Sequence, residues 1–302
     1  MKTNRNVLLV AVLLAATCGL FAAETPAEKL YLWKATSPTN TVYLFGTIHL
    51  GVDSMYPLAD EINAAFESSK VLAVEADTRN EARAQQVMLQ KAVFKGDGPL
   101  DKVVSKKTLD LLGAWAQKRG VPLIGLQMFR PWAVAMSVAM VEAQQCGMKP
   151  ELGLDKHLLD KAAGKKTIVE LESIEGQLDM LASFPADVQE TFLAETLKQA
   201  ANSKEELEAM LAAWKNGDPD GMVKVAITKP LERNPEFKAV NEKFLDDRNI
   251  KMVEKIDVFL KGKDPHFVAV GAAHLVGEKG LVKLLQAKGY TVEQVTRKPA
   301  AK

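Results

Sequence analysis

The sequence predicts an α/β protein with a central, mostly parallel or mixed sheet, and a pattern repeated near its two ends is the main reason. Residues 42–50 and 267–275 each read as four apolar strand residues, Gly, two residues, His and Leu. A helical pattern and a second apolar run follow each copy, which is the β-α-β unit of a parallel sheet. We therefore expect two related β-α-β halves in one sheet, with a large helical insertion at about 81–262 between them.

The first half begins with a hairpin. Residues 31–34 and 41–45 have strand character, and the sequence Ser-Pro-Thr-Asn at 37–40 indicates a turn between them. Apolar residues at helical spacing predict a helix at 57–69. The apolar run that leads to Glu75 predicts a buried strand at 71–75.

The middle of the chain is mainly helical, and the second half follows it. Helix formers with apolar residues on one side predict helices near 81–93, 106–119, 131–145, 153–163, 174–181 and 186–214, with one strand at 167–171. A turn bracketed by Pro230 and Pro235 precedes a long helix at about 237–261. The second half then contributes a strand at 267–270, a helix at 278–287 and a strand at 290–295.

The N-terminus has the composition of a secretory signal peptide, with a basic start, a short apolar stretch and small residues up to Ala23. We expect cleavage after Ala22 or Ala23, which leaves residues 24–302 as a single domain in the periplasm or outside the cell, without a stable membrane span. The apolar stretch is marginal for a transmembrane helix, which needs about 20 residues. A retained anchor and a lipid-modified Cys18 are the alternatives.

Charge and cysteine content narrow the expected partners. Without its first 23 residues the chain has 37 basic and 38 acidic residues. This balance provides no long-range attraction to phosphate, so we expect no nucleic-acid partner. Cys146 would be the sole cysteine of the processed chain, so its stability must come from the core rather than from an internal disulfide.

Five polar side chains follow predicted strands. His49 and His274 come just after two strands, Glu75 ends a third, and Glu170 and Glu172 lie at the end of a fourth. Ligands of open parallel sheets bind at the carboxyl ends of the strands, so we expect these side chains to meet in one site. We also expect the Gly before each His to adopt a backbone conformation that a side chain would disfavour.

Two imidazoles with a carboxylate are suitable ligands for a divalent metal, which makes His49, His274 and Glu75 the expected metal ligands. A metal with an open coordination position lowers the pKa of bound water toward about 7 and supports hydrolysis at neutral pH. The spacing differs from His-Glu-x-x-His, so this is not a conventional helix-borne zinc peptidase site. His157 and His266 lie in a predicted helix and ahead of a strand, where we expect surface roles.

Three further groups have two interpretations each. Arg248 provides a positive charge for an oxyanion or a substrate carboxylate, or it forms a structural ion pair. Glu172 is a further ligand or a general base, or it caps the helix that begins near Ile174. Arg130 and Asp155 form a structural pair or support the metal ligands.

The sequence resembles the TraB/GumN family over about residues 30–295, and the segments that carry the resemblance are 32–34, 46–51, 74–75, 130–132, 153–155, 171–172 with Gln177, 248–249 and 271–277. This family includes the Tiki metalloproteases and is distantly similar to erythromycin esterases and haem-binding ChaN proteins. The resemblance implies an active centre of His49, Glu75 and His274, with a divalent metal such as manganese or cobalt supporting peptidase activity.

These observations predict an exported metal-dependent hydrolase that is peptidase-like and acts on a peptide or another small hydrolysable substrate. His49, His274 and Glu75 would hold manganese, cobalt or zinc, while Glu75, Glu172 and Arg248 would take part in the chemistry. The alternative is a non-catalytic periplasmic binding protein for a metal, haem or peptide, and haem would need axial ligands that face an apolar slot. An accessory role in conjugation or envelope polysaccharide biology is a third possibility.

Overall fold

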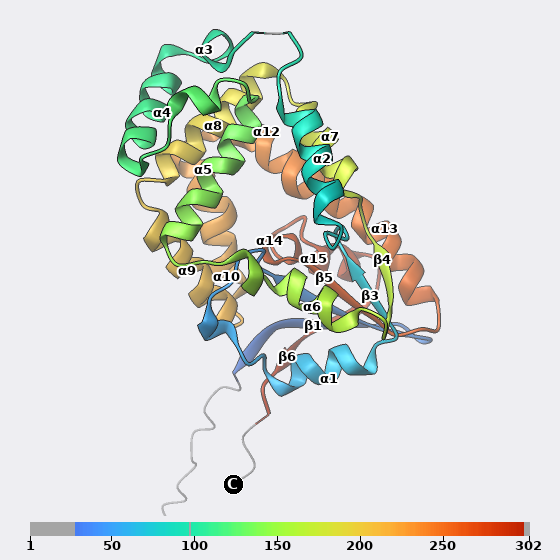
Figure 1. Ribbon diagram of the computed structural model, residues 1–302. Helices are drawn as coiled ribbons and strands as arrows, with labels where there is room; N and C mark the ends of the chain where they lie inside the picture. The colour runs from blue at the N-terminus through green and yellow to red at the C-terminus, as the bar shows by residue number, and fades with distance from the viewer. Residues whose placement is uncertain (1–27, 97, 299–302) are drawn as a thin grey trace, which may run out of the picture.

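The computed structural model describes residues 28–96 and 98–298, so the expected signal peptide and Cys18 lie outside the described residues. Six strands form one mixed sheet in the order β4-β3-β5-β2-β1-β6, which confirms the α/β fold class (Figure 1). The strands are β1 (Lys29–Thr36), β2 (Thr41–Thr47), β3 (Val71–Val74), β4 (Thr167–Glu170), β5 (His266–Gly271) and β6 (Thr291–Thr296).

Helices make up most of the remaining described chain. They are α1 (Asp60–Ser68), α2 (Glu81–Ala92), α3 (Leu100–Val103), α4 (Lys106–Arg119), α5 (Pro131–Gln145), α6 (Leu154–Ala162), α7 (Ile174–Ala182), α8 (Ala186–Gln199), α9 (Ser203–Lys215), α10 (Pro219–Val223), α11 (Lys229–Arg233), α12 (Lys238–Asn241), α13 (Asp247–Lys261), α14 (Ala272–Leu275) and α15 (Leu281–Ala287). Many of those between β3 and β5 gather beyond the end of the sheet where these two strands finish (Figure 1).

The two repeated motifs lie on neighbouring parallel strands. β2 pairs with β5 in parallel, with Gly46 beside Val270 and Thr47 beside Gly271. β5 is also parallel to β3, whereas β1 runs antiparallel to both β2 and β6. The two β-α-β halves therefore interleave, because β3 ends the first half and pairs with β5, which begins the second. The carboxyl ends of β2, β3 and β5 consequently share one edge of the sheet.

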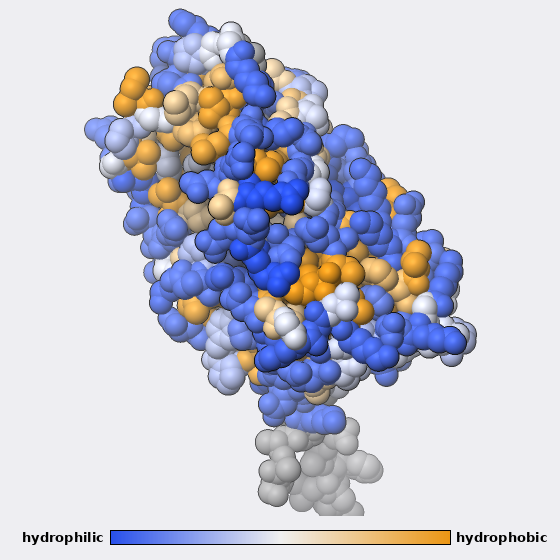
Figure 2. All heavy atoms as spheres, turned by 45° about the vertical axis from the view of Figure 1, so that its right-hand side comes forward, coloured by the Kyte–Doolittle hydropathy of each residue, from blue (hydrophilic) through white to orange (hydrophobic). Residues whose placement is uncertain are grey.

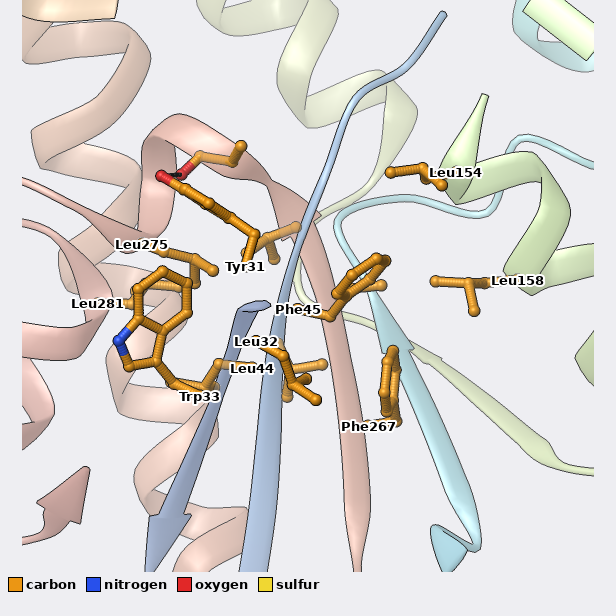
Figure 3. Packing of buried hydrophobic residues seen from close by; sticks show 14 of the residues in the cluster. Tyr31, Leu32, Trp33, Leu44, Phe45, Leu154, Leu158, Phe267, Leu275 and Leu281 are labelled. Carbon is orange, nitrogen blue, oxygen red and sulfur yellow. Dashed lines mark hydrogen bonds between the residues drawn. The ribbon is translucent and has the colours of Figure 1, made fainter. Parts of the chain in front are cut away.

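Apolar side chains cover both faces of the sheet (Figure 3). On one face, Leu154 and Leu158 of α6 lie beside Phe45 and Phe267, whose ring centroids are 5.6 Å apart. On the other face, Leu281 of α15 lies near Trp33, and α13 packs against α15. Since strand side chains alternate between faces, these two layers account for the nearly continuous apolar runs of the central strands.

Two predicted helices are divided in the structure. The helix expected at 186–214 is two helices, α8 and α9, separated near Asn202. The helix expected at 237–261 contains a π-helical segment, η6 (Glu242–Asp246), between α12 and α13. Neither break has the Pro or Gly that marks a helix end in a sequence. A π segment also keeps helical dihedral angles, so hydrophobic periodicity does not reveal it.

Two further properties of the described residues concern membrane-spanning helices and disulfides. Within residues 28–96 and 98–298, no helix is both long and apolar enough to cross a membrane. Cys146 is a free thiol, so the large apolar cluster around the sheet and two smaller clusters among the helices stabilise the described chain.

Candidate functional site

The structure brings His49 and His274 to the same edge of the sheet. His49 follows β2 by two residues, and His274 lies in α14, the helical turn directly after β5. A Cβ atom added to Gly271 would lie 3.8 Å from Nε2 of His49 and 3.5 Å from Cδ2 of His274. The two imidazoles therefore approach one common point, although they come from opposite ends of the chain.

The motif glycines provide space rather than an unusual backbone conformation, which corrects our expectation from the sequence. Gly271 has a φ of −49°, and Gly46 is not among the positive-φ glycines of the described chain. A Cβ on Gly46 would lie 2.4 Å from Cδ1 of Tyr31, and a Cβ on Gly271 would lie 3.2 Å from Oε1 of Glu75. A side chain at Gly46 would collide with the buried Tyr31, and one at Gly271 would crowd the buried Glu75.

Glu75 lies between the two histidines and is almost fully buried, with 8% of its side chain exposed. Its Oε1 accepts a hydrogen bond from the main-chain N–H of Gly271 at 2.6 Å, and its Oε2 accepts one from Arg248 at 2.6 Å. Burial raises the pKa of Glu75, but His274, His49, Arg248 and the Gly271 N–H together lower it to about 2. Glu75 is thus an anion at neutral pH.

Asn249 fixes the tautomer of His274. Nδ1 of His274 lies 2.6 Å from Oδ1 of Asn249, whose Nδ2 donates to the main-chain oxygen of Lys279 at 2.8 Å. The amide therefore presents its oxygen to the imidazole, so Nδ1 carries the proton and Nε2 keeps its lone pair. Burial lowers the pKa of His274 to about 4, which leaves the ring neutral at pH 7.

Asp155 has the corresponding position beside His49. Its Oδ2 lies 2.9 Å from Nδ1 of His49, and its Oδ1 accepts a hydrogen bond from Oγ1 of Thr47 at 2.7 Å. Unlike His274, His49 is 64% exposed at its side chain. The Asp155 carboxylate raises the pKa of His49 to about 9. The contact supports the interpretation of Asp155 as a residue that orients a possible ligand.

Arg248 binds two carboxylates at once. Its Nε lies 3.0 Å from each oxygen of Glu172, and its Nη2 lies 2.6 Å from Oε2 of Glu75 and 2.7 Å from Oε2 of Glu172. Gln177 joins the same network, because its Nε2 lies 3.0 Å from both Glu75 and Glu172. These are the contacts of a buried ion pair, and a role of Arg248 toward a substrate remains a prediction.

Other residues singled out in the sequence have different positions. Glu172 is not the cap of α7, since Ser173 accepts the hydrogen bond from the N–H of Gly176. His157 and His266 are half-buried rather than on the surface, and their rings lie against Tyr56 and Phe259.

Arg130 also departs from the sequence-based picture. Its guanidinium lies 5.4 Å from the centre of the Phe94 ring. This ring contact is not the sole interaction of Arg130. Asp155, the partner that the sequence suggested for Arg130, is hydrogen-bonded to His49 and Thr47 instead.

The donor atoms fit a cation between the histidines, although the described residues contain no group of three His, Cys, Asp or Glu side chains already arranged to hold one. In both imidazoles it is Nδ1 that makes the hydrogen bond to the neighbouring side chain. Nε2 takes no part in that bond. Glu75 adds an anionic oxygen, and Oε1 has a second lone pair besides the one used by Gly271. Arg248 pairs with the carboxylates of Glu75 and Glu172, and the Asp155 carboxylate pairs with His49.

The fold and this cluster define an α/β protein with a His-Glu-His site at the carboxyl edge of its parallel strands. The chain belongs to the TraB/PrgY/gumN family, whose family model matches residues 31–294. The resemblance inferred from the repeated motifs is therefore confirmed.

Relatives of this chain extend over most of its length. The uncharacterized protein YbaP of Escherichia coli (strain K12) is 29% identical over 261 residues, which cover 85% of this chain and 93% of YbaP. YbaP of Shigella flexneri is similar to the same extent. An uncharacterized protein of Treponema pallidum (strain Nichols) is 26% identical over 73% of this chain and 69% of its own length. No solved structure matches the chain.

Sequence reasoning did not assign roles to three of the groups in this cluster. Asn249 and Thr47 stand in the sequence only as members of motifs, and the main-chain N–H of Gly271 has no signature in a sequence. The adjacency of Asn249 to Arg248 was the one available signal. Arg248 and Asn249 lie in the first turn of α13. The side chain of Arg248 binds the carboxylates of Glu75 and Glu172, whereas that of Asn249 binds His274.

Proposed function

We propose that the protein is an exported, metal-dependent hydrolase of the peptidase type, in which His49, Glu75 and His274 hold a divalent cation such as manganese, cobalt or zinc. The observation that supports this most is the pair of acceptors formed by Nε2 of His274 and Oε1 of Glu75, 3.6 Å apart. Two lone pairs that face each other in a buried place repel unless a proton or a cation lies near them. A cation is the choice that also uses His49.

The local charge agrees with a divalent cation. Without a metal, the Asp155 carboxylate holds His49 protonated at pH 7, so the carboxylates of Glu75, Glu172 and Asp155 exceed the charges of Arg248 and His49 by one negative charge. A bound dication that displaces the proton of His49 would face an excess of two negative charges. A bound dication would polarise a carbonyl group and lower the pKa of water. Asn249 and Asp155 would orient the two imidazoles by accepting the Nδ1 protons.

The chain's own residues would then carry the proton transfers of hydrolysis. The oxygen of water forms a bond to the carbonyl carbon, the C–N bond breaks, and a proton of the water ends on the leaving amine. We assign the transfer of this proton to Glu75 and Glu172, which Arg248 holds in place, because Asp155 is already engaged by Nδ1 of His49. This assignment keeps both carboxylates and the arginine in the reaction, as the sequence led us to expect.

Metal analysis and a peptide-library digest test the proposal. Protein that is stripped with a chelator and reloaded with manganese, cobalt or zinc should bind about one ion per chain and cleave library peptides only when loaded. His49→Gln and His274→Gln should each lose most of the metal and the cleavage, because an amide is a poorer ligand than imidazole. His157→Gln is the matched control, and it should retain both. Loaded protein that cleaves no member of the library would contradict the hydrolase.

A binding protein is the second candidate, supported by the full engagement of Arg248 and Glu172 with one another. Such an arrangement is rigid and leaves these groups with few free atoms for chemistry. The same experiment separates the two functions, since a binding protein would retain the metal or peptide without cleavage. A visible absorption band on the purified protein would indicate that haem is the ligand.

A further inference from the structure

The strand β4 lies at one edge of the sheet, next to the candidate site. It pairs only with β3 in the order of the six strands. Thr167 and Glu170 at its ends are exposed, and Ile168 and Val169 are half-buried. An edge strand of this kind presents main-chain donors and acceptors that another extended chain can bind.

The hydrogen bonds around β4 show which residues face outward. The N–H of Leu171 donates to the carbonyl of Val74, so Leu171 faces β3. The carbonyl of Glu170 instead accepts from Nζ of Lys255 at 3.3 Å, on the other side. Since successive main-chain groups of a strand alternate between its two sides, the N–H and C=O groups of Ile168 also point away from β3. The described residues provide no main-chain partner for Ile168 on that side.

A cavity of about 770 Å³ continues from the end of this strand. Glu170 belongs both to β4 and to the cavity wall, and the other walls come from the connection between β3 and α2 and from the start of α7. Asp77, which lies two positions after Glu75, and Ser173, which directly follows Glu172, both line the cavity. The cavity is thus adjacent to the candidate site and has the size of a ligand pocket.

The chemistry of this region fits a polypeptide better than a compact apolar molecule. Arg79 pairs with Asp77, and Arg83 pairs with Glu175, so charges of both signs line the cavity. The face turned forward in Figure 2 is mainly hydrophilic, with apolar residues in separate patches. Such a surface gains affinity through hydrogen bonds more than through apolar burial, and a main-chain ladder provides these hydrogen bonds for almost any sequence.

We propose that the outer edge of β4 is the substrate-binding strand of this protein, on which an extended, unfolded polypeptide pairs with Ile168 and Glu170 and continues into the adjacent cavity. Cleavage of the bound polypeptide rests on the proposed function, whereas its binding to β4 does not. Glu172 lies four positions after Ile168, about 13 Å of extended chain at 3.3 Å per residue. A substrate must therefore extend about four residues beyond its scissile bond to reach Ile168, so short peptides should bind more weakly than decapeptides.

Amide hydrogen exchange on the chelator-treated wild-type protein tests the binding strand without any need for cleavage. A random-sequence decapeptide library should slow exchange at Ile168 and Glu170 by at least about tenfold, while Val169, which faces β3, should change little. The same library with an N-methyl group at every position should not protect Ile168, because it has no main-chain donors on either edge. Equal protection by both libraries, or none at Ile168 with either, would overturn the proposal.

A substitution on β4 provides a second measurement. Ile168→Pro removes the outward N–H, and proline is tolerated on an edge strand where the N–H faces solvent. Its dissociation constant for the unmodified library should rise about tenfold, with a melting temperature close to that of wild type. An unchanged dissociation constant would also reject β4 as the binding strand. Protection at Ile168 without cleavage would reject hydrolysis alone, and cleavage without protection would reject the binding strand alone.

Discussion

Nε2 of His274 lies 3.6 Å from Oε1 of Glu75, and neither atom carries a hydrogen to place between them. The proton of His274 is on Nδ1, where Asn249 accepts it. The pKa of Glu75 is about 2, so its carboxylate is ionised at neutral pH. Arg248 lies against the other oxygen of Glu75, Oε2, so a cation beside Oε1 and Nε2 of His274 would stabilise this contact.

Asn249→Ala should release the tautomer of His274. Without the Oδ1 acceptor, the proton can move to Nε2 and form a hydrogen bond with Glu75 in place of a metal. We expect the affinity for manganese or cobalt to fall about 10- to 100-fold, the usual effect of losing the partner of a histidine ligand. Isothermal titration of chelator-treated protein measures this. Asn202→Ala is the control, because Asn202 is exposed and its side chain caps no helix; equal affinities in both variants would contradict the assignment.

Gly271→Ala should block the site without straining the backbone. Its φ of −49° suits any residue, but the new methyl would lie 3.2 Å from Oε1 of Glu75 and between the two imidazoles. We expect loss of most metal binding with little change in the far-ultraviolet circular dichroism spectrum. Gly113→Ala in α4 is the control, since a Cβ there meets nothing within 4 Å. This control should gain about 0.5–1 kcal/mol of stability and bind metal normally.

Arg248→Lys should lower turnover more than metal content. Lysine keeps the charge but cannot bond to Glu75 and both oxygens of Glu172 together. Arg119→Lys is a matched control, because Arg119 makes a similar two-pronged ion pair with Glu142 among the helices. Both variants should melt at a lower temperature than wild type, and only Arg248→Lys should lose turnover per bound metal. A parallel loss in both would mean that Arg248 acts through stability alone.

Glu142 should make the stability of the helical part depend on pH. Burial raises its pKa, but hydrogen bonds from Arg119, Ser203 and Trp115 outweigh burial and hold it below the ordinary 4.5. Glu142 therefore stabilises the fold above pH 4.5, and this contribution is lost as the pH falls through the folded-state pKa. Glu142→Gln should cost about 3 kcal/mol at pH 7 in urea unfolding. The difference from wild type should shrink at pH 3; a constant difference would show that the charge is not involved.

Export is predicted from residues 1–23 alone. Protein recovered from its native host should have the mass of a chain that begins after Ala22 or Ala23. Intact-mass spectrometry distinguishes this from the alternatives. A mass that includes Met1 would indicate a retained segment, and one with acyl chains on Cys18 would indicate a lipoprotein.

Much of the fold could be predicted because it depends on local patterns. Helices such as α4 and α5 begin and end where caps and apolar periodicity indicate, at Lys106–Arg119 and Pro131–Gln145. The division of α8 from α9 and the π segment before α13 could not be predicted, because no local breaker marks them. The choice of β5 rather than β2 as the neighbour of β3 is likewise a property of the assembled sheet.

The candidate site, like the fold, could be predicted from the sequence only in part. The repeated motif alone was enough to predict that His49 and His274 follow equivalent strands, and the rule that parallel strands end at one edge then predicted that they meet. Only the tertiary structure decided that His274 is buried and neutral beside Asn249, whereas His49 is exposed beside Asp155. The burial and the tautomer of a histidine depend on side chains from other helices and strands that lie a few ångströms away in space. The positions of these residues along the chain do not reveal those distances.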